Sequence, residues 1–292
     1  MDTSQPTLRT RFAPSPTGYL HLGHVAHALC VWQMAERLGA QVLLRIEDHD
    51  RGRCRREYEA AILNDLEWLG FKPDIAGTAE FRRGACPWRQ SDRGPFYERM
   101  LQELTASQHV YACTCSRKEV LARTGQESRD ELWYDGYCRN RGLPLERGCG
   151  IRVALPDGSV RFEDLLAGAQ VQVPARQCGD LLLRDRHGNW TYQFAVVADD
   201  LDHDINLVIR GLDLIESTGR QLLLARMLGR PTPPVFAHHP LLYDETGKKL
   251  SKRFYATSVA QLREAGHSAS AVLAEAQALL GAPWEAITSR QM

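Results

Sequence analysis

The sequence lacks a long hydrophobic run and an excess of charge of either sign. No window approaches 18 uninterrupted apolar residues, and the polar start MDTSQPTLRT has neither the charged nor the apolar region of a signal peptide. Lys plus Arg and Asp plus Glu are both 36, so the formal net charge is zero. We therefore expect a cytoplasmic protein with no membrane partner, which meets any polyanion through a local patch.

Internal repeats and low-complexity tracts are also absent. The eight cysteines are too few and too scattered over 292 residues to form a disulfide scaffold. Hydrophobic residues make up 43% and charged residues 25%, which is the composition of a globular protein that can bury a sizeable core. A chain that is disordered over most of its length is excluded.

The chain begins with an alternation of strands and helices. The pattern predicts a strand from Leu8, a helix over 20–38 closed by Gly39, a strand over 41–48 and a helix over 55–69. This order is typical of a parallel, doubly wound α/β sheet, whose ligands lie beyond the carboxyl ends of the strands.

The pattern changes in the middle of the chain. A further helix over 94–107 is followed by short segments with Gly and Pro punctuation, which indicate the hairpins of a mixed insertion. The remaining predicted elements are a helix at 191–202, a strand at 205–211, a helix at 213–228, a strand at 235–243 and one or two helices near 258–281.

The predicted organisation has four parts. They are the first half of a nucleotide-binding α/β domain at 1–109, an insertion at 110–190, the second half of the α/β domain at 191–255, and a short helical tail at 256–292.

The segment RFAPSPTGYLHLGH joins the first strand to the first helix. His21 and His24 are three residues apart, so the start of a helix places both imidazoles on one face beside unpaired backbone N–H groups. Gly23 lets the backbone approach a nucleotide closely, and such a corner suits a triphosphate. Two surface histidines on a capped helix are the alternative interpretation of the histidine pair alone.

The segment DETGKKLSKR is a glycine-containing basic loop after the last predicted parallel strand. It could close over phosphates, whereas a solvated run of charge is the alternative for this loop taken alone.

Both segments resemble signatures of the class I aminoacyl-tRNA synthetases. RFAPSPTGYLHLGH resembles the HIGH signature in the form used by the glutamyl and glutaminyl branch, and KLSKR resembles the KMSKS loop, with Leu250 in the Met position. The resemblance implies the class I synthetase fold, with Mg²⁺ supplied by ATP and with His21, His24 and Lys252 as catalytic residues. The residues implied in ATP binding are His21, Gly23, His24, Lys249, Ser251 and Lys252.

The reaction that these two segments imply is nucleotidyl transfer. A carboxylate attacks the α-phosphate of ATP and pyrophosphate leaves, which requires positioning and preorganised donors but no protein nucleophile.

Charged residues at predicted strand ends indicate the amino acid that is activated. Arg11 and Arg210 suit a substrate with two carboxylates, and Glu47 could accept hydrogen bonds from an α-ammonium. Salt bridges or a packed aromatic are the alternatives for each residue alone. Resemblance to the glutamyl-tRNA synthetases implies glutamate as substrate, and it implies these binding residues: Arg11, Ala13, Ser15, Glu47, Tyr192 and Arg210.

One position departs from the glutamyl pattern. Where full-length glutamyl enzymes usually continue the Tyr motif as YxxANV, this chain has YQFAVV, so Val196 replaces an Asn. We expect the lost amide to alter hydrogen bonding near the substrate.

Cys113, Cys115 and Cys138 lie within 26 residues of one another. In a cytosolic protein this spacing favours a zinc site over a disulfide, with a metal-free reduced cluster as the alternative. We expect a zinc here to be structural, one per chain. The family pattern CxC…YxxxC implies that Tyr134 is the fourth ligand, while Tyr137, Asp135 and water remain alternatives.

About 40 residues follow KLSKR, whereas a glutamyl-tRNA synthetase carries a large C-terminal domain that reads the anticodon. In this respect the chain resembles the glutamyl-queuosine tRNA(Asp) synthetase family, which are stand-alone relatives of the glutamyl catalytic domain. The resemblance implies ATP-dependent activation of L-glutamate and its attachment to queuosine at the wobble position of tRNA(Asp), a tRNA modification.

Two alternatives remain open at this point. One is transfer of activated glutamate to another acceptor, such as a tRNA 3′ end or a carrier protein. The other is a catalytically silent RNA-binding paralogue. RNA contact is compatible with the arginine-rich segments 51–57 and 81–93, although solvated charge explains either segment taken singly.

Overall fold

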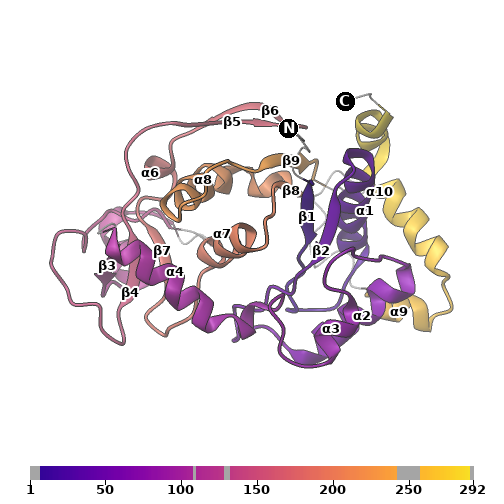
Figure 1. The fold of residues 1–292 in the computed structure, drawn as a ribbon, viewed down its shortest axis with the longest axis horizontal. Coiled ribbons are helices and arrows are strands. Elements are labelled where there is room, and N and C mark those ends of the chain that lie inside the picture. The colour runs from indigo at the N-terminus through magenta and orange to yellow at the C-terminus, as the bar shows by residue number, and fades with distance from the viewer. Residues whose placement is uncertain (1–6, 108–109, 128–131, 242–256, 290–292) are drawn as a thin grey trace, which may run out of the picture.

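The computed structural model describes residues 7–107, 110–127, 132–241 and 257–289 (Figure 1). Its centre is built from two pairs of parallel strands. β1 (Arg9–Phe12) pairs with β2 (Gln41–Leu44), and β8 (Leu207–Gly211) pairs with β9 (Val235–His239). The pairs adjoin, because β1 lies against β8 and the backbone N–H of Asn206 donates to Arg9 O at 3.1 Å. The parallel α/β arrangement predicted from the sequence is therefore confirmed.

Helices cover these strands and bury their apolar side chains. The helices of this half are α1 (Leu22–Leu38), α2 (Arg56–Leu69), α3 (Thr78–Arg82), α7 (Tyr192–Asp202) and α8 (Thr218–Met227). α1 ends at Gly39, whose φ of 64° is a left-handed conformation that glycine adopts without steric cost. Its buried face, including Val25 and Val31, packs against Phe12 and Leu44 of the strands.

The predicted insertion has its own antiparallel sheet. The strands are β3 (Val110–Cys113), β4 (Gly150–Val153) and β7 (Leu181–Arg184), in the order β3-β4-β7. Two helices lie in this region, α5 (Arg117–Thr124) and α6 (Pro174–Gln177), and α4 (Gly94–Ala106) precedes it. The sequence did not indicate α5 or α6, because both are short and carry little apolar periodicity.

A second hairpin of the insertion leaves this sheet. β5 (Val160–Asp164) pairs with β6 (Gly168–Gln172), and the end of β5 makes a parallel pairing with β9 between Asp164 and Phe236. The hairpin thus extends the sheet of the parallel α/β half, which the sequence did not predict because strand partners separated by many residues leave no local signal.

Other element boundaries differ from those predicted. The strand expected over 41–48 ends at Leu44, and beyond it Ile46 makes only an isolated bridge to Arg89. The helix expected over 213–228 begins with a 3₁₀ segment, η2 (Leu212–Ser217), before α8, and a second 3₁₀ turn, η1 (Gln90–Asp92), precedes α4. The strand expected over 235–243 ends at His239 as β9, residues 240–241 are not in a strand, and residues 242–243 lie outside the described part of the chain.

The C-terminal part lies along the outside of α1 (Figure 1). It consists of α9 (Val259–Glu264) and α10 (Ala269–Ser289), which has a break in helical geometry at Gly281. Trp284 is 1% exposed, and its indole Nε1 donates to Gln33 Oε1 on α1 at 2.6 Å. Gln33 Nε2 in turn donates to Gln277 Oε1 at 2.8 Å, so polar and apolar contacts both fix α10 to α1.

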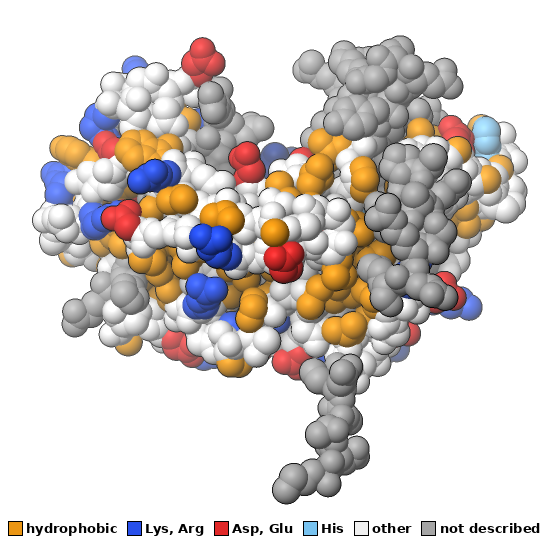
Figure 2. All heavy atoms as spheres, turned by 90° about the horizontal axis from the view of Figure 1, so that it is seen from above, with side chains coloured by type: hydrophobic (Ala, Val, Ile, Leu, Met, Phe, Trp, Pro, Cys, Tyr) orange, Lys and Arg blue, Asp and Glu red, His pale blue; other side chains and the backbone are white. Residues whose placement is uncertain are grey.

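On the face shown in Figure 2, basic side chains are interspersed with apolar and acidic ones, in keeping with the net charge of zero. None of the helices within the described ranges is long and apolar enough to span a bilayer.

We predict that Trp284→Ala destabilises the protein by about 3–5 kcal/mol, because it removes a fully buried aromatic side chain and leaves a cavity between α1 and α10. Urea unfolding measures this change. Glu275→Ala, at an exposed position of the same helix, is the matched control and should change the free energy of unfolding by about 0.5 kcal/mol or less. An unchanged midpoint for Trp284→Ala would show that this contact does not hold the C-terminal part.

Candidate active site

A cavity of about 320 Å³ lies at the carboxyl ends of β1 and β8. Five of the six residues predicted to bind the amino acid line it together, which are Arg11, Ala13, Glu47, Tyr192 and Arg210. The sixth, Ser15, lines the neighbouring cavity. Residues separated by about two hundred positions meet here because parallel strands end at the same edge of the sheet.

Two of the charged groups at this cavity have buried ionic partners. Arg11 Nε donates to Asp200 Oδ1 at 3.1 Å, and Arg45 donates to the same oxygen at 2.7 Å and to Glu47 Oε1 at 2.8 Å. Burial favours the neutral form of Asp200, but the two guanidinium groups outweigh it and lower the pKa of this carboxyl. These contacts hold Arg11 and Glu47 in place and largely balance their charges.

Arg210 is held differently. Its Nε donates to His238 Nε2 at 2.9 Å and its Nη1 to Gln221 Oε1 at 2.7 Å. Its Nη2 donates to Thr218 Oγ1 at 2.9 Å and to the Leu214 carbonyl oxygen at 3.4 Å, and all four acceptors are neutral. The residue is 4% exposed, and no carboxylate in the described part of the chain forms an ion pair with it. Burial lowers the pKa of this guanidinium, although an arginine remains charged in a protein. A buried cation without an anionic partner is suited to an anionic ligand.

The histidine pair lines a second cavity of about 500 Å³. His21 is the N-cap of α1, and its Nδ1 accepts from the backbone N–H of Gly23 at 3.1 Å, while His24 Nδ1 accepts from the N–H of His21 at 3.2 Å. The two ring centroids are 3.9 Å apart. Since each Nδ1 accepts, Nε2 carries the hydrogen of each neutral ring and is the donor.

The position of the His21 ring depends on Gly23. A Cβ at residue 23 would lie 3.0 Å from a carbon of the imidazole, so a larger residue would displace the ring. Lys249, Ser251 and Lys252, which the sequence predicts to bind ATP, lie outside the described residues.

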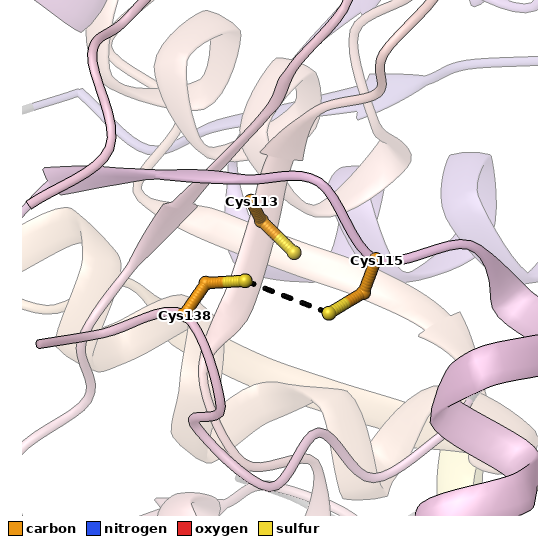
Figure 3. Close-up of side chains that lie close together, drawn as sticks. All are labelled: Cys113, Cys115 and Cys138. Atoms are coloured by element: carbon orange, nitrogen blue, oxygen red, sulfur yellow. Dashed lines mark hydrogen bonds between the residues drawn. The ribbon is translucent and has the colours of Figure 1, made fainter. Parts of the chain in front are cut away.

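Cys113, Cys115 and Cys138 converge in the insertion, and Figure 3 shows their side chains pointing toward one another. Their sulfur atoms all lie within 4.8 Å of one another. Burial opposes ionisation of Cys138, but hydrogen bonds with Tyr134, the Thr114 backbone and the other two thiols outweigh it and lower its pKa to about 6. These hydrogen bonds therefore favour the thiolate form of Cys138.

The structure distinguishes the residues considered as the fourth ligand. The phenol oxygen of Tyr134 lies 3.3 Å from Cys113 Sγ and 3.6 Å from Cys115 Sγ. Asp135 is instead bound by Arg123 at 2.8 Å, and Tyr137 is 50% exposed. Three sulfur atoms and one oxygen atom thus form a set that could hold a tetrahedral metal ion.

Comparison with known proteins identifies the fold. The family described as "tRNA synthetases class I (E and Q), catalytic domain" matches residues 7–289. The chain belongs to this family. It is thereby a member of the aminoacyl-tRNA synthetase ligases, which confirms the resemblance seen in the two signature segments.

Its relatives carry two names. Glutamate-tRNA ligase of Legionella pneumophila (strain Lens) is 42% identical over 265 residues, which are 89% of this chain and 54% of the relative. Glutamyl-Q tRNA(Asp) synthetase of Nitratidesulfovibrio vulgaris is 40% identical over 275 residues, 89% of this chain and 82% of the relative. The protein of that name from Symbiobacterium thermophilum is 39% identical over 93% of this chain and 86% of the relative. The chain thus spans about half the length of the glutamate-tRNA ligases that it matches.

A solved structure shows the same fold. The glutamate tRNA ligase of Elizabethkingia meningosepticum, in complex with its amino acid, superimposes with a TM-score of 0.71 and 31% identity. The match covers 89% of this chain and 53% of that one.

Several residues of this class I site were not identified from the sequence. Arg45 and Asp200 form the buried ionic contacts under the cavity, and Asp199 accepts hydrogen bonds from Arg93 Nε at 2.8 Å and from Tyr97 Oη at 2.9 Å. For Asp199 and Asp200, the sequence signal that could have indicated them is the pair of adjacent aspartates in the apolar helix YQFAVVADDLD.

His27 also lines the cavity at the carboxyl ends of β1 and β8 and was not predicted. Its Nδ1 lies 2.9 Å from His239 Nε2, and His239 Nδ1 lies 3.0 Å from the Pro240 carbonyl oxygen. Because a carbonyl only accepts and burial lowers the pKa of both histidines, His239 donates to Pro240 and His27 donates to His239. His27 Nε2 is then an acceptor.

Val196, where the glutamyl enzymes usually have Asn, is 1% exposed and packs with Phe194 and Leu224 in the apolar cluster between α7 and the insertion. It is not among the residues that line the cavity. The expectation that it alters hydrogen bonding at the substrate is not supported by this position, because the side chain of residue 196 points to the core side of α7.

Proposed function

We propose that the protein activates L-glutamate with ATP to form glutamyl-adenylate. The observation that carries this proposal is the buried Arg210 cation in a cavity adjoining the histidine pair of α1. A carboxylate of glutamate would supply the anionic partner that Arg210 lacks, and Arg11, Glu47 and Tyr192 supply the other polar groups of the cavity.

In this proposal one carboxylate oxygen of glutamate attacks the α-phosphorus of ATP, an anhydride bond forms and pyrophosphate leaves. His21 and His24 donate hydrogen bonds from Nε2 to phosphate oxygens at the positive end of α1. Lys252 contributes a further positive charge, and Mg²⁺ arrives with the nucleotide. The cavity residues hold the amino acid in line with the bond that breaks.

The first test is glutamate-dependent pyrophosphate exchange in the absence of tRNA. We expect exchange with L-glutamate and none with glutamine.

Arg210→Gln should raise the KM for glutamate by about 10- to 100-fold, the usual range for a lost hydrogen bond to a charged group. Lys252→Ala should lower the exchange rate by about 10²–10³-fold. Arg226→Gln, an exposed arginine on α8, is the control and should behave as the wild type. Absence of exchange would favour a silent RNA-binding protein.

We further propose that the activated glutamate is transferred to queuosine at the wobble position of tRNA(Asp). A hydroxyl oxygen of the cyclopentenediol ring would attack the carbonyl carbon of the adenylate, an ester would form and AMP would leave. Support comes from the two relatives named glutamyl-Q tRNA(Asp) synthetase, which match most of this chain. The relatives named glutamate-tRNA ligase favour the tRNA 3′ end as a second candidate acceptor.

A third cavity, of about 410 Å³, could receive part of the RNA. It extends from Cys113 and Tyr134 of the insertion to Thr191 and Gln193, which flank Tyr192 of the amino-acid cavity. Its basic lining residues are Arg117, Arg152, Arg186 and His187. The two acids in the lining are engaged, because Asp180 binds Arg139 and Asp185 binds the backbone of its own turn. A basic cavity beside the activated amino acid suits a phosphate-bearing acceptor.

The acceptor is identified by transfer of labelled glutamate onto two tRNA pools, one with queuosine and one from cells that cannot make it. We expect label only in the queuosine pool. Equal label in both pools would identify the 3′ end as the acceptor, and periodate oxidation of that end should then abolish it. No label in either pool, with exchange intact, would point to a carrier other than tRNA.

We also propose that Cys113, Cys115, Cys138 and Tyr134 hold a structural zinc ion. The positive charges of Arg152 and Arg123 support this proposal, since each donates to a cluster sulfur at 3.4 Å and would offset the charge of the thiolates. The zinc would cross-link β3 to the segment around residue 138, in an insertion with only a small apolar cluster around the cysteines.

Metal analysis of the purified protein tests the zinc site. We expect one zinc per chain in the wild type, loss of zinc in Cys138→Ser, and retention in the control Cys149→Ser, a thiol of the same insertion outside the cluster. Tyr134→Phe keeps the ring against Arg152 and removes only the oxygen, so it should weaken zinc binding. Unchanged zinc affinity in Tyr134→Phe would assign the fourth position to water.

A further inference from the structure

Asp164 and His238 form a fully buried pair directly behind Arg210. His238 Nδ1 lies 2.5 Å from Asp164 Oδ2, and both side chains have no exposed surface. Asp164 ends β5 of the insertion hairpin, whereas His238 and Arg210 lie on the neighbouring strands β9 and β8. Neither Asp164 nor His238 is among the residues that line a cavity at the amino-acid site.

The pair fixes which nitrogen of His238 carries the hydrogen. Asp164 also accepts from the backbone N–H groups of Leu166 and Ala167, at 3.0 and 2.9 Å. Burial opposes its charge, but the hydrogen bonds from His238 and these amides outweigh it and lower the pKa of the carboxyl to about 2. A carboxylate only accepts, so His238 Nδ1 donates, and Nε2 of the neutral ring keeps its lone pair.

That lone pair accepts the Nε–H of Arg210 at 2.9 Å. With Gln221 on Nη1, and Thr218 and the Leu214 carbonyl oxygen on Nη2, four hydrogen bonds define the plane and direction of the guanidinium. The negative charge of Asp164 is one imidazole away and does not pair with Arg210. By contrast, Arg11 contacts Asp200 directly.

We infer that Asp164 and His238 are positioning residues for substrate binding: they orient Arg210 toward the carboxylate of the amino acid while keeping the Asp164 carboxylate out of direct contact with it. This inference rests on the proposed activation of glutamate. It also gives the β5–β6 hairpin a role in the site, because the hairpin supplies Asp164, and its Gln172 additionally bonds Ile215 O at 2.7 Å and the Gly219 N–H at 2.8 Å beside Arg210.

Two substitutions of His238 separate its two hydrogen bonds. In His238→Asn the amide nitrogen takes the place of Nδ1 and keeps the bond to Asp164, but the acceptor for Arg210 is lost. In His238→Gln the side-chain oxygen can replace Nε2 as the acceptor. Asp164→Asn removes the charge that selects the tautomer, so the ring can present an N–H to Arg210.

The experiment measures KM for glutamate and for ATP by pyrophosphate exchange in the intact chain. We expect His238→Asn and Asp164→Asn to raise the KM for glutamate by about 10- to 100-fold, with the KM for ATP within about twofold of the wild type. His238→Gln should lie closer to the wild type than His238→Asn. Glu163→Gln, an exposed position on the same strand, is the matched control.

A double-mutant cycle adds a readout that a purely structural role would not give. Lysine has no Nε–H with the arginine geometry, so in Arg210→Lys the change His238→Asn should cost little more in glutamate KM. If His238→Asn does not fold, the KM values of Asp164→Asn and His238→Gln for glutamate and ATP test the inference in the same way.

Three results would overturn the inference. They are an unchanged KM for glutamate in folded His238→Asn, a parallel rise of both KM values, and full additivity with Arg210→Lys. If the wild type shows no glutamate-dependent exchange, the proposed function itself fails, and that outcome is known before any variant is measured.

Discussion

A single carboxylate, that of Asp200, joins the elements that form the cavity at the carboxyl ends of β1 and β8. Its Oδ1 accepts from Arg11 at the end of β1 and from Arg45 just after β2, and it belongs to α7, which also carries Tyr192. Taking three charged groups out of water is costly, so such an arrangement persists only when every charge is paired and hydrogen-bonded. This requirement fixes β1, β2 and α7 relative to one another, and the walls of the cavity follow from it.

Among these buried arginines, Arg210 is the one that has no carboxylate in direct contact within the described part of the chain. Arg11 and Arg45 have carboxylate partners, while Arg210 is bound by an imidazole, an amide, a hydroxyl and a backbone carbonyl. The protein thus retains one buried positive charge at the point where the strands end. A charge of this kind lowers stability in the absence of a ligand and favours binding of an anion, a cost that is typical of binding sites.

The insertion contributes to the site at two separate places. Its hairpin β5–β6 reaches the parallel strands and supplies Asp164 behind Arg210, and its antiparallel sheet carries the cysteine cluster beside a basic cavity. A segment that interrupts the α/β half in sequence is therefore continuous with it in space. The insertion thus contributes to the cavity at the strand ends through its hairpin and to the basic cavity through its antiparallel sheet.

The sequence by itself determined the α/β order, the histidine pair, the arginines of the cavity and the three cysteines, because periodicity and short spacing are local properties. It also favoured Tyr134, through resemblance, as the residue that joins the cysteines. Only the tertiary structure decided that β5 pairs with β9, that Asp200 and Arg45 balance Arg11, that Val196 packs in the core, and that Asp164 and His238 hold Arg210. Those contacts join residues far apart in the chain, and whether a buried charge is paired or left for a ligand depends on which distant side chains reach it.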